Sequence, residues 1–177
     1  FYARVKEAYL NVYRRCGLDA VVAKADGGVF TEKFSHEFQV ATDAGEDWIY
    51  TDKETGESMN KEVVPEEDWE NTDKYDIARA IEVGNIFPLE CKFTHAFDFR
   101  VQGADGEMKD VIMGCYGIGP SRVMGSVVEV LHDEAGMIWP EEIAPFAVHI
   151  VPVKFDDEVQ RRVAEDLYTQ LRDAGVE

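Results

Sequence analysis

The segment Val111–Arg122, which reads VIMGCYGIGPSR, constrains the fold of this chain more than any other. An apolar stretch suited to a strand runs into glycines and then Pro120, and this order is typical of a strand-to-helix turn. We therefore predict a helix from about 120 to 132. Glycines at 114, 117 and 119 let a nucleotide approach the backbone closely, and Arg122, one turn into the helix, is suited to bind phosphate oxygens. The spacing matches neither the dinucleotide fingerprint nor the P-loop, so a tight turn with a surface arginine remains the alternative.

Composition limits the classes of protein to which the chain can belong. Its 177 residues are 45% hydrophobic, which is enough to bury a core, and no run of eighteen apolar residues predicts a membrane helix. The formal net charge of −18 disfavours nucleic-acid binding by this segment itself. Three widely spaced cysteines argue against a disulfide framework and fit a reducing cytoplasm. The chain opens without methionine and stops abruptly, so we expect both ends to be internal to a longer protein.

Hydrophobic periodicity predicts a mixture of helices and strands. A helix is expected at 1–15, and a second one is expected after Asp156-Asp157, which supplies the N-cap. Residues 51–74 are acidic, show little periodicity, and are predicted to form a loosely packed surface loop. The predicted strands lie at 19–25, 36–41, 78–87 and 146–153, and a hairpin is predicted between 97–101 and 111–113 around a turn at 102–107.

Four segments in the same order resemble one family, the bacterial-type prolyl-tRNA synthetases. The string VIMGCYGIGPSRVMG followed by HDEAGMIWPEEIAPF closely resembles their third class II motif and the connection into their anticodon domain. The other three segments are the stretch 23–38 ending in SHEF, the segment GEDWIY, and the strand ARAIEVGNIFPLECKFT. The resemblance covers nearly the whole chain apart from the acidic stretch.

The resemblance implies an α+β fold. Residues 1–143 would form the C-terminal part of a class II catalytic core, an antiparallel sheet flanked by helices. Residues 144–177 would open an α/β anticodon-binding domain with its first β–α unit. Within the core, 51–74 would be a short acidic loop at the place where many bacterial-type relatives carry a large editing domain.

The implied function is that of an aminoacyl-tRNA ligase, which uses ATP and Mg²⁺ to activate proline and then joins the proline to tRNA(Pro). The resemblance also implies a cytoplasmic homodimer with no membrane attachment. The segments that carry the first and second class II motifs are not present in this sequence, so the fragment alone is expected to be inactive.

The resemblance also implies roles for nucleotide-binding residues. Arg122 matches the arginine of the third motif, which implies that it binds the γ-phosphate end of ATP as the catalytic residue. Glu82 and Asn85 would face the nucleotide, and the carboxylate of Glu82 could hold Mg²⁺. Gly117 and Gly119 would leave room for the nucleotide. Glu82 and Asn85 could instead be ordinary residues on a strand surface.

A small apolar proline pocket is implied around Phe87, Cys115, Gly117 and His36. For Cys115 the alternative is a small buried hydrophobic residue, and for His36 it is a core histidine oriented by a backbone carbonyl. The other histidines do not cluster as ligands would, so no structural metal is expected.

The chain departs from the family pattern at three places. Thr31-Glu32 stands where relatives usually have Gly-Gly before SHEF, Asn85 replaces a common histidine, and Glu90 replaces a glycine. The glutamate leaves the backbone conformation at that position open. Two other functions remain open: a class II paralogue that binds ATP or an amino acid without charging tRNA, and a non-catalytic acidic interaction protein.

Overall fold

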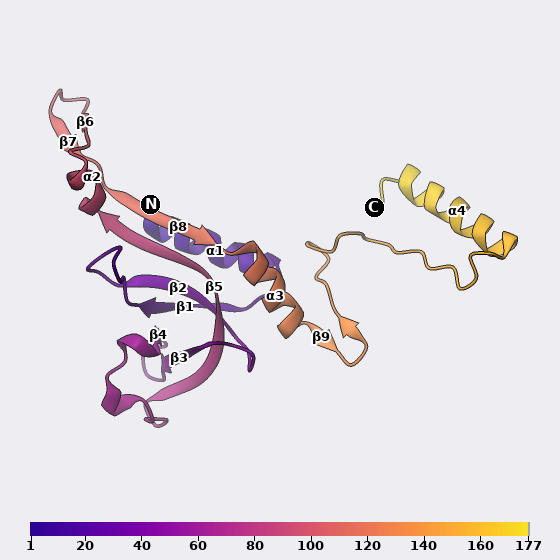
Figure 1. Cartoon of the computed structure of the whole chain (residues 1–177), viewed down its shortest axis with the longest axis horizontal. Coiled ribbons are helices and arrows are strands. Elements are labelled where there is room, and N and C mark those ends of the chain that lie inside the picture. Colours follow the sequence, from indigo (N-terminus) through magenta and orange to yellow (C-terminus); the bar gives the residue numbers. More distant parts are fainter. Residues whose placement is uncertain (177) are drawn as a thin grey trace. The chain divides into compact units, whose positions relative to one another are not determined.

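The computed structural model describes residues 1–176. The chain divides into two compact units, Phe1–Ile138 and Trp139–Glu177. The first unit holds a six-stranded sheet, on one face of which helix α1 (Tyr2–Arg15) lies (Figure 1). The mixed α+β class predicted from the sequence is therefore confirmed. Within residues 1–176, none of the helices combines the length and the apolar character needed to cross a membrane.

The sheet curls back on itself through its long fifth strand. Strand β1 (Ala20–Ala25) pairs antiparallel with β2 (Ser35–Ala41) and parallel with β4 (Ser58–Asn60). Strand β4 pairs with β3 (Asp47–Asp52), and β5 (Tyr75–Glu90) then pairs with both β3 and β2, which completes a ring of five strands. Small and branched side chains fill a buried cluster where these strands meet: Ala23, Ile49 and Ala80.

Strand β5 is longer than predicted. It was expected to end at Phe87 because proline follows, yet the strand continues through Pro88 to Glu90. Strand β8 (Met113–Ile118) pairs with β5 from Gly84 onward, and beyond the pair His36–Ile86, where β2 stops, it is the one neighbour left to β5 among the described strands. Pro88 tolerates this position because an edge-like strand does not need every N–H group. The β5–β8 register shifts between Pro88 and Glu90.

The acidic stretch 51–74 is more ordered than predicted. It contains β4 and two short 3₁₀ turns, Lys61–Val63 and Glu66–Asp68. Val64 is buried against Tyr50 and Tyr75, and Met59 and Ile77 pack at the edge of this cluster. The few apolar residues between the charges therefore fix the segment, which composition alone did not indicate.

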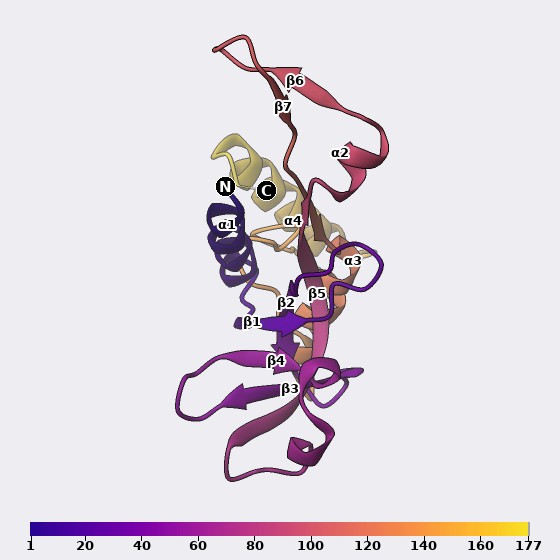
Figure 2. The ribbon, with the colours of Figure 1, turned by 90° about the vertical axis from the view of Figure 1, so that its left-hand side faces the viewer.

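The hairpin strands lie closer to their turn than predicted. Residues Lys92–Ala96 form a short helix, α2, and Phe97 ends that helix instead of starting a strand. The hairpin consists of β6 (Arg100–Gln102) and β7 (Met108–Asp110), and it projects beyond the sheet (Figure 2). Met113 instead starts β8, which leads directly into α3 (Pro120–Val130), as the glycine-rich segment predicted. Two-residue strands β9 (His132–Asp133) and β10 (Gly136–Met137) follow.

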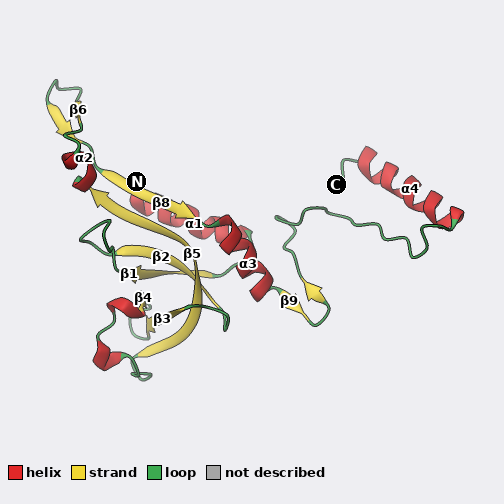
Figure 3. Cartoon of the chain, viewed as in Figure 1, coloured by secondary structure: helices red, strands yellow, loops and turns green. Residues whose placement is uncertain are grey.

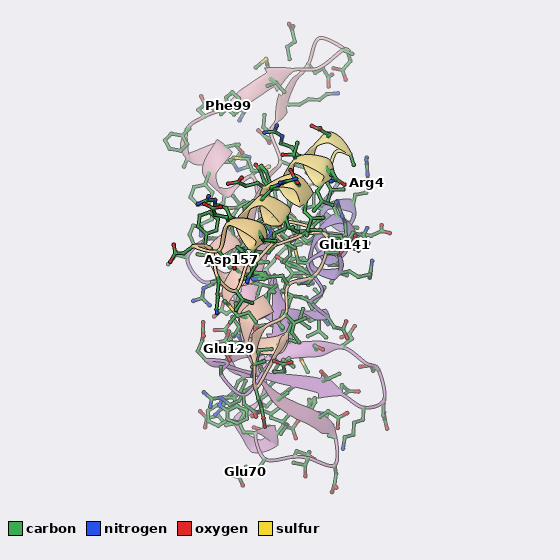
Figure 4. The ribbon with its side chains drawn as sticks, turned by 90° about the vertical axis from the view of Figure 1, so that its right-hand side faces the viewer. Arg4, Glu70, Phe99, Glu129, Glu141 and Asp157 are labelled. Carbon is green, nitrogen blue, oxygen red and sulfur yellow. The ribbon has the colours of Figure 1, made fainter. Side chains whose placement is uncertain are left out.

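The second unit contains the predicted helix but not the predicted strand. Helix α4 spans Glu158–Asp173, and the carboxylate of Asp157 accepts hydrogen bonds from the backbone N–H groups of Val159 and Gln160 (Figure 4). Residues 146–153 are irregular (Figure 3). No described strand pairs with them, and a lone extended segment has no ladder hydrogen bonds to hold it. The first β–α unit expected here is therefore only half present.

Candidate active site

The two faces of the sheet differ because side chains alternate along each strand. Helix α1 covers one face with Tyr9 and Tyr13, whose rings lie 5.1 and 5.4 Å from the ring of Phe38. The opposite face is buried at Glu37 and Gln39 on β2 and opens toward β8, where Cys115 is exposed and space lies over Gly117. The register places Glu37 opposite Asn85, Asn85 opposite Gly117, and Phe87 opposite Cys115 on this face. We call these residues, together with Gln39 and Glu82, the open-face site.

A network of acceptors occupies the centre of the open-face site. The Glu37 carboxylate accepts hydrogen bonds at 2.9 Å from the amides of Gln39 and Asn60, and a longer one at 3.5 Å from Asn85. Burial raises the pKa of Glu37, and the hydrogen bonds from Asn60 and Gln39 oppose that rise. The side-chain amide oxygens of Gln39 (Oε1) and Asn85 (Oδ1) are buried and have no hydrogen-bond partner among the described residues. The site therefore holds acceptors that are free to bind a donor or a cation.

Glu82 lies beside this network, opposite Gln39 in the register. Burial raises its pKa, a hydrogen bond with Asn85 lowers it, and the nearby carboxylate of Asp47 raises it again. Asp47 itself accepts a hydrogen bond from Gln39 at 2.9 Å. Acidic groups from β2, β3 and β5 thus converge on the same region.

Arg122 is brought to the same place by the turn between β8 and α3. The backbone N–H of Gly119 donates to the carbonyl of Val83 at 3.0 Å, which fixes the start of α3 beside β5. The Arg122 guanidinium donates to the carboxylate of Glu46 and, at 3.3 Å, to the carbonyl of Glu82. The hydrogen bond with Glu46 is the main cause that raises the pKa of Arg122. The side chain is about half exposed, at 52%, so an anionic ligand could reach it.

The apolar end of the open-face site is formed by Phe87, Cys115 and Gly117. Cys115 is exposed, so the alternative of a buried hydrophobic residue does not describe it. A Cβ atom built at Gly117 meets no atom within 4 Å, which shows that open space lies over this glycine. The ring of Phe30, from the loop before β2, lies 5.1 Å from that of Phe87.

His36 is not part of this arrangement. It pairs with Ile86, which places its side chain on the face that α1 covers. Its Nδ1 lies 2.9 Å from the hydroxyl of Tyr2, and that hydroxyl donates to the carbonyl of Ile86. Burial, followed by the nearby charges of Lys6 and Lys24, lowers the pKa of His36. In this structure half-buried His36 ties the first turn of α1 to the sheet through the Tyr2 hydroxyl, whereas the alternative left open by the sequence was orientation by a backbone carbonyl.

The sequence did not point to four residues that lie in or beside the open-face site: Glu37, Gln39, Glu46 and Asp47. A signal for the first two existed, because Glu37 and Gln39 alternate with the apolar Phe38 and Val40 along a strand. Polar residues on one face of a strand whose other face is apolar are ordinarily read as solvent-facing. The curl of the sheet, which brings Asn60 of β4 to Glu37 and Asp47 of β3 to Gln39, buries this polar face, with Glu37 9% and Gln39 0% exposed.

The fit of Mg²⁺ to the site rests on Glu82. Among residues 1–176, no three histidine, cysteine or acidic side chains lie close enough together to hold a metal ion. Mg²⁺ is commonly held by one or two carboxylates together with substrate phosphates and water, so one carboxylate beside a phosphate site is a suitable donor. The unpartnered oxygen of Asn85 adds a second hard donor next to it.

Curated proteins and solved structures resemble the chain along nearly its whole length. No family model matches the chain. The proline–tRNA ligase of Bartonella tribocorum is 36% identical over 203 residues, covering 98% of this chain and 46% of that protein. The proline–tRNA ligase of Brucella anthropi is likewise 36% identical, over 99% of this chain and 46% of that protein. The chain thus spans a little under half the length of the curated relatives that it matches.

Two solved structures have a similar fold. Giardia lamblia prolyl-tRNA synthetase in complex with prolyl-adenylate matches with a TM-score of 0.65 and 16% identity, covering 99% of this chain and 31% of that one. Prolyl-tRNA synthetase from Cryptosporidium parvum, complexed with L-proline and AMP, matches with a TM-score of 0.58 and 14% identity, over the same shares. At these identities the likeness supports the fold.

Proposed function

Because the chain is homologous to the proline–tRNA ligases along nearly its whole length, we propose that it forms part of an enzyme that activates proline with ATP and transfers it to tRNA(Pro). One observation carries this proposal. The acidic residues, the apolar end and the guanidinium of Arg122 meet on the face of the sheet that α1 does not cover. The ligands named for the two structural neighbours, prolyl-adenylate, L-proline and AMP, are those of the activation step.

The reaction assigns a task to each part of the open-face site. An oxygen of the proline carboxylate attacks the α-phosphorus of ATP, the bond from that phosphorus to the bridging oxygen breaks, and pyrophosphate leaves with the bonding electrons. Prolyl-adenylate remains, and a ribose hydroxyl of the tRNA then attacks its carbonyl carbon and releases AMP. Such chemistry depends on positioning and on charge neutralisation more than on a protein base.

Arg122 is the residue that we assign to the phosphates. Its guanidinium is held beside β5 by the carbonyl of Glu82 and by Glu46, and it is exposed enough to exchange Glu46 for a phosphate. Two parallel N–H groups of arginine match the spacing of phosphate oxygens. Mg²⁺, held by Glu82 and the phosphates, would neutralise charge on the triphosphate. Asn85, Gly117 and Gly119 would lie along the nucleotide.

Phe87, Cys115 and Gly117 are assigned to the proline ring, because they form the apolar end of the site. The unpartnered side-chain oxygen of Gln39, together with the Glu37 carboxylate, supplies acceptors for a positively charged amine. We leave His36 out of the pocket, because its side chain lies on the face covered by α1.

The two units of the chain suggest a domain boundary close to the expected one. The first unit ends at Ile138, whereas the resemblance implied an end at residue 143. We propose that the first unit belongs to the catalytic core and that the second opens the anticodon-binding domain. The resemblance to the family also supports a cytoplasmic homodimer that binds tRNA(Pro). The stretch 51–74, with its small buried cluster around Val64, would replace the editing domain.

The test is proline-dependent exchange of radiolabelled pyrophosphate into ATP by the complete protein that carries this chain, followed by charging of tRNA(Pro). Exchange with proline and formation of prolyl-tRNA are the expected results. Exchange without charging would instead support a paralogue that activates an amino acid without tRNA. Absence of both exchange and ATP–Mg²⁺ binding would leave an interaction protein as the better description.

A further inference from the structure

The loop at residues 26–34, here the 26–34 loop, connects β1 to β2 and crosses the apolar end of the open-face site. Its backbone turns tightly: the N–H groups of Phe30 and Thr31 both donate to the carbonyl of Gly27. A Cβ at Gly27 would come within 2.3 Å of the carbonyl oxygen of Lys33, so only glycine fits there. Gly28 has φ +53°, a conformation that also favours glycine.

Contacts at both ends and in the middle hold the 26–34 loop in place. At its start, the backbone N–H of Asp26 donates to Glu62 at 2.7 Å. In its middle, the Lys92 ammonium donates to the carbonyl of Val29. Near its end, Lys33 forms an ion pair at 2.7 Å with Glu90. These contacts tether the loop to the Lys61–Val63 turn, to α2 and to β5.

Lys33 and Glu90 join two places where the chain departs from the family pattern. Lys33 follows Thr31-Glu32, which stands in place of Gly-Gly, and Glu90 stands in place of glycine. Glu90 has φ +52°, which costs a residue with a side chain about 1–2 kcal/mol relative to glycine. The ion pair gives a physical reason for a glutamate at a position that glycine suits better.

We propose that the 26–34 loop forms the end wall of the amino-acid site, with Phe30 packed on Phe87 to set the size of the ring accepted and with the Lys33–Glu90 ion pair holding the loop. This inference rests on the proposed function. Phe30 lies against Phe87 at a ring distance of 5.1 Å and is 46% exposed, so one side of its ring packs while the other is free for a substrate. Phe34, 56% exposed, belongs to the same loop.

The test compares Phe30→Ala with Phe34→Ala in the complete protein, by pyrophosphate exchange with two substrates. One is proline, and the other is pipecolic acid, which has one more methylene in its ring. A methylene in an apolar pocket changes discrimination by roughly 10–200-fold. We expect Phe30→Ala to raise the ratio of kcat/KM for pipecolic acid over proline by at least about tenfold. Phe34→Ala should leave this ratio within about twofold of the wild type, because its ring is not packed on Phe87.

The outcomes separate the two proposals. If the wild type exchanges with proline but Phe30→Ala shifts the ratio no more than Phe34→Ala, the end wall lies elsewhere and the proposed function stands. If the wild type shows no exchange with proline, the proposed function fails first. Phe30→Leu should restore most of the discrimination against pipecolic acid. Failure of that rescue would also overturn the inference.

The ion pair is tested by Lys33→Met, with Lys109→Met as its control. Lys109 pairs with Asp105 at 2.6 Å in the β6–β7 hairpin, away from the open-face site. We expect Lys33→Met to raise KM for proline a few-fold, roughly the effect of one exposed pair, and to leave kcat unchanged. The Lys109→Met variant should leave both constants unchanged. Equal effects of the two variants would show that the pair does not position the loop.

Discussion

The hydroxyl of Tyr13 lies directly over the backbone of Gly84, so that a Cβ atom built at residue 84 would come within 2.1 Å of the hydroxyl oxygen. The same Cβ would lie 2.8 Å from the carbonyl oxygen of Gly117 on β8. Helix α1 can therefore approach β5 this closely only because residue 84 has no side chain. Gly117, one strand away, has open space over it instead. The two glycines thus mark the packed face and the open face of the same sheet.

Alanine at these two glycines should separate stability from binding. Gly84→Ala is expected to destabilise the chain by about 1–3 kcal/mol, because it forces α1 away from the sheet. The Cβ atom of Gly117→Ala would meet no other atom, so the free energy of unfolding should stay the same or rise slightly. Alanine loses less backbone entropy than glycine when a strand forms. In pyrophosphate exchange, Gly117→Ala should raise KM for proline or ATP. Urea unfolding and exchange kinetics check both effects, and a destabilised Gly117→Ala would contradict this placement.

Tyr13→Phe should stabilise the chain. The Tyr13 hydroxyl is fully buried and has no hydrogen-bond partner among the described residues, and burial is the main cause that raises its pKa. An unsatisfied buried polar group costs about 1–3 kcal/mol, so its removal should raise the free energy of unfolding by about 1 kcal/mol. The same change should lessen the cost of Gly84→Ala, since it removes the nearer clash. If the two substitutions prove additive in a double-mutant cycle, they do not share this contact.

Sequence patterns predicted the elements better than they predicted the faces. The turn from β8 into α3 was predicted because glycine and proline act locally, and the cap of α4 at Asp157 was predicted for the same reason. The side on which His36 lies depends on its pairing with Ile86, which no local pattern contains. The predicted end of β5 at Phe87 was wrong, because Pro88 was expected to end the strand and the pairing of β5 with β8 could not be known from the sequence. The prediction of a strand at 146–153 was wrong, because an apolar run forms a strand only when a second strand pairs with it.

Glu90 offers a direct measure of backbone strain. Glu90→Gly and Glu90→Ala both remove the carboxylate that pairs with Lys33, but only glycine relieves the positive φ of +52°. We expect the glycine variant to be more stable than the alanine variant by about 1 kcal/mol. Thermal unfolding of the two variants gives the difference without any assumption about the ion pair. Equal stabilities would show that the backbone relaxes when the pair is lost.

Arg122→Ala should reduce proline-dependent pyrophosphate exchange by at least about a hundredfold, because one preorganised charge contact to a transferring phosphate contributes roughly 3 kcal/mol. Arg122→Lys keeps the charge but loses the paired N–H groups and should recover only part of the activity. Arg4, which is exposed on α1 (Figure 4), serves as the control, and Arg4→Ala should exchange like the wild type. Near wild-type exchange by Arg122→Ala would remove this residue from the phosphate site.

Glu37 should make stability fall as the pH rises. Burial raises its pKa in the folded chain above the ordinary value of about 4.3, so the folded state binds the proton more tightly than the unfolded state. The resulting loss in the free energy of unfolding is absent below the ordinary pKa, develops as the pH rises through the raised pKa of the folded chain, and persists at higher pH. Glu37→Gln removes the charge and keeps one side-chain oxygen that can accept from the amides of Gln39 and Asn60. We therefore expect the variant to be more stable at pH 7 and to lose less stability between pH 4 and pH 7 than the wild type. Urea midpoints across that range measure this, and parallel profiles for the two proteins would place the titrating group elsewhere, with Glu82 the next residue to replace.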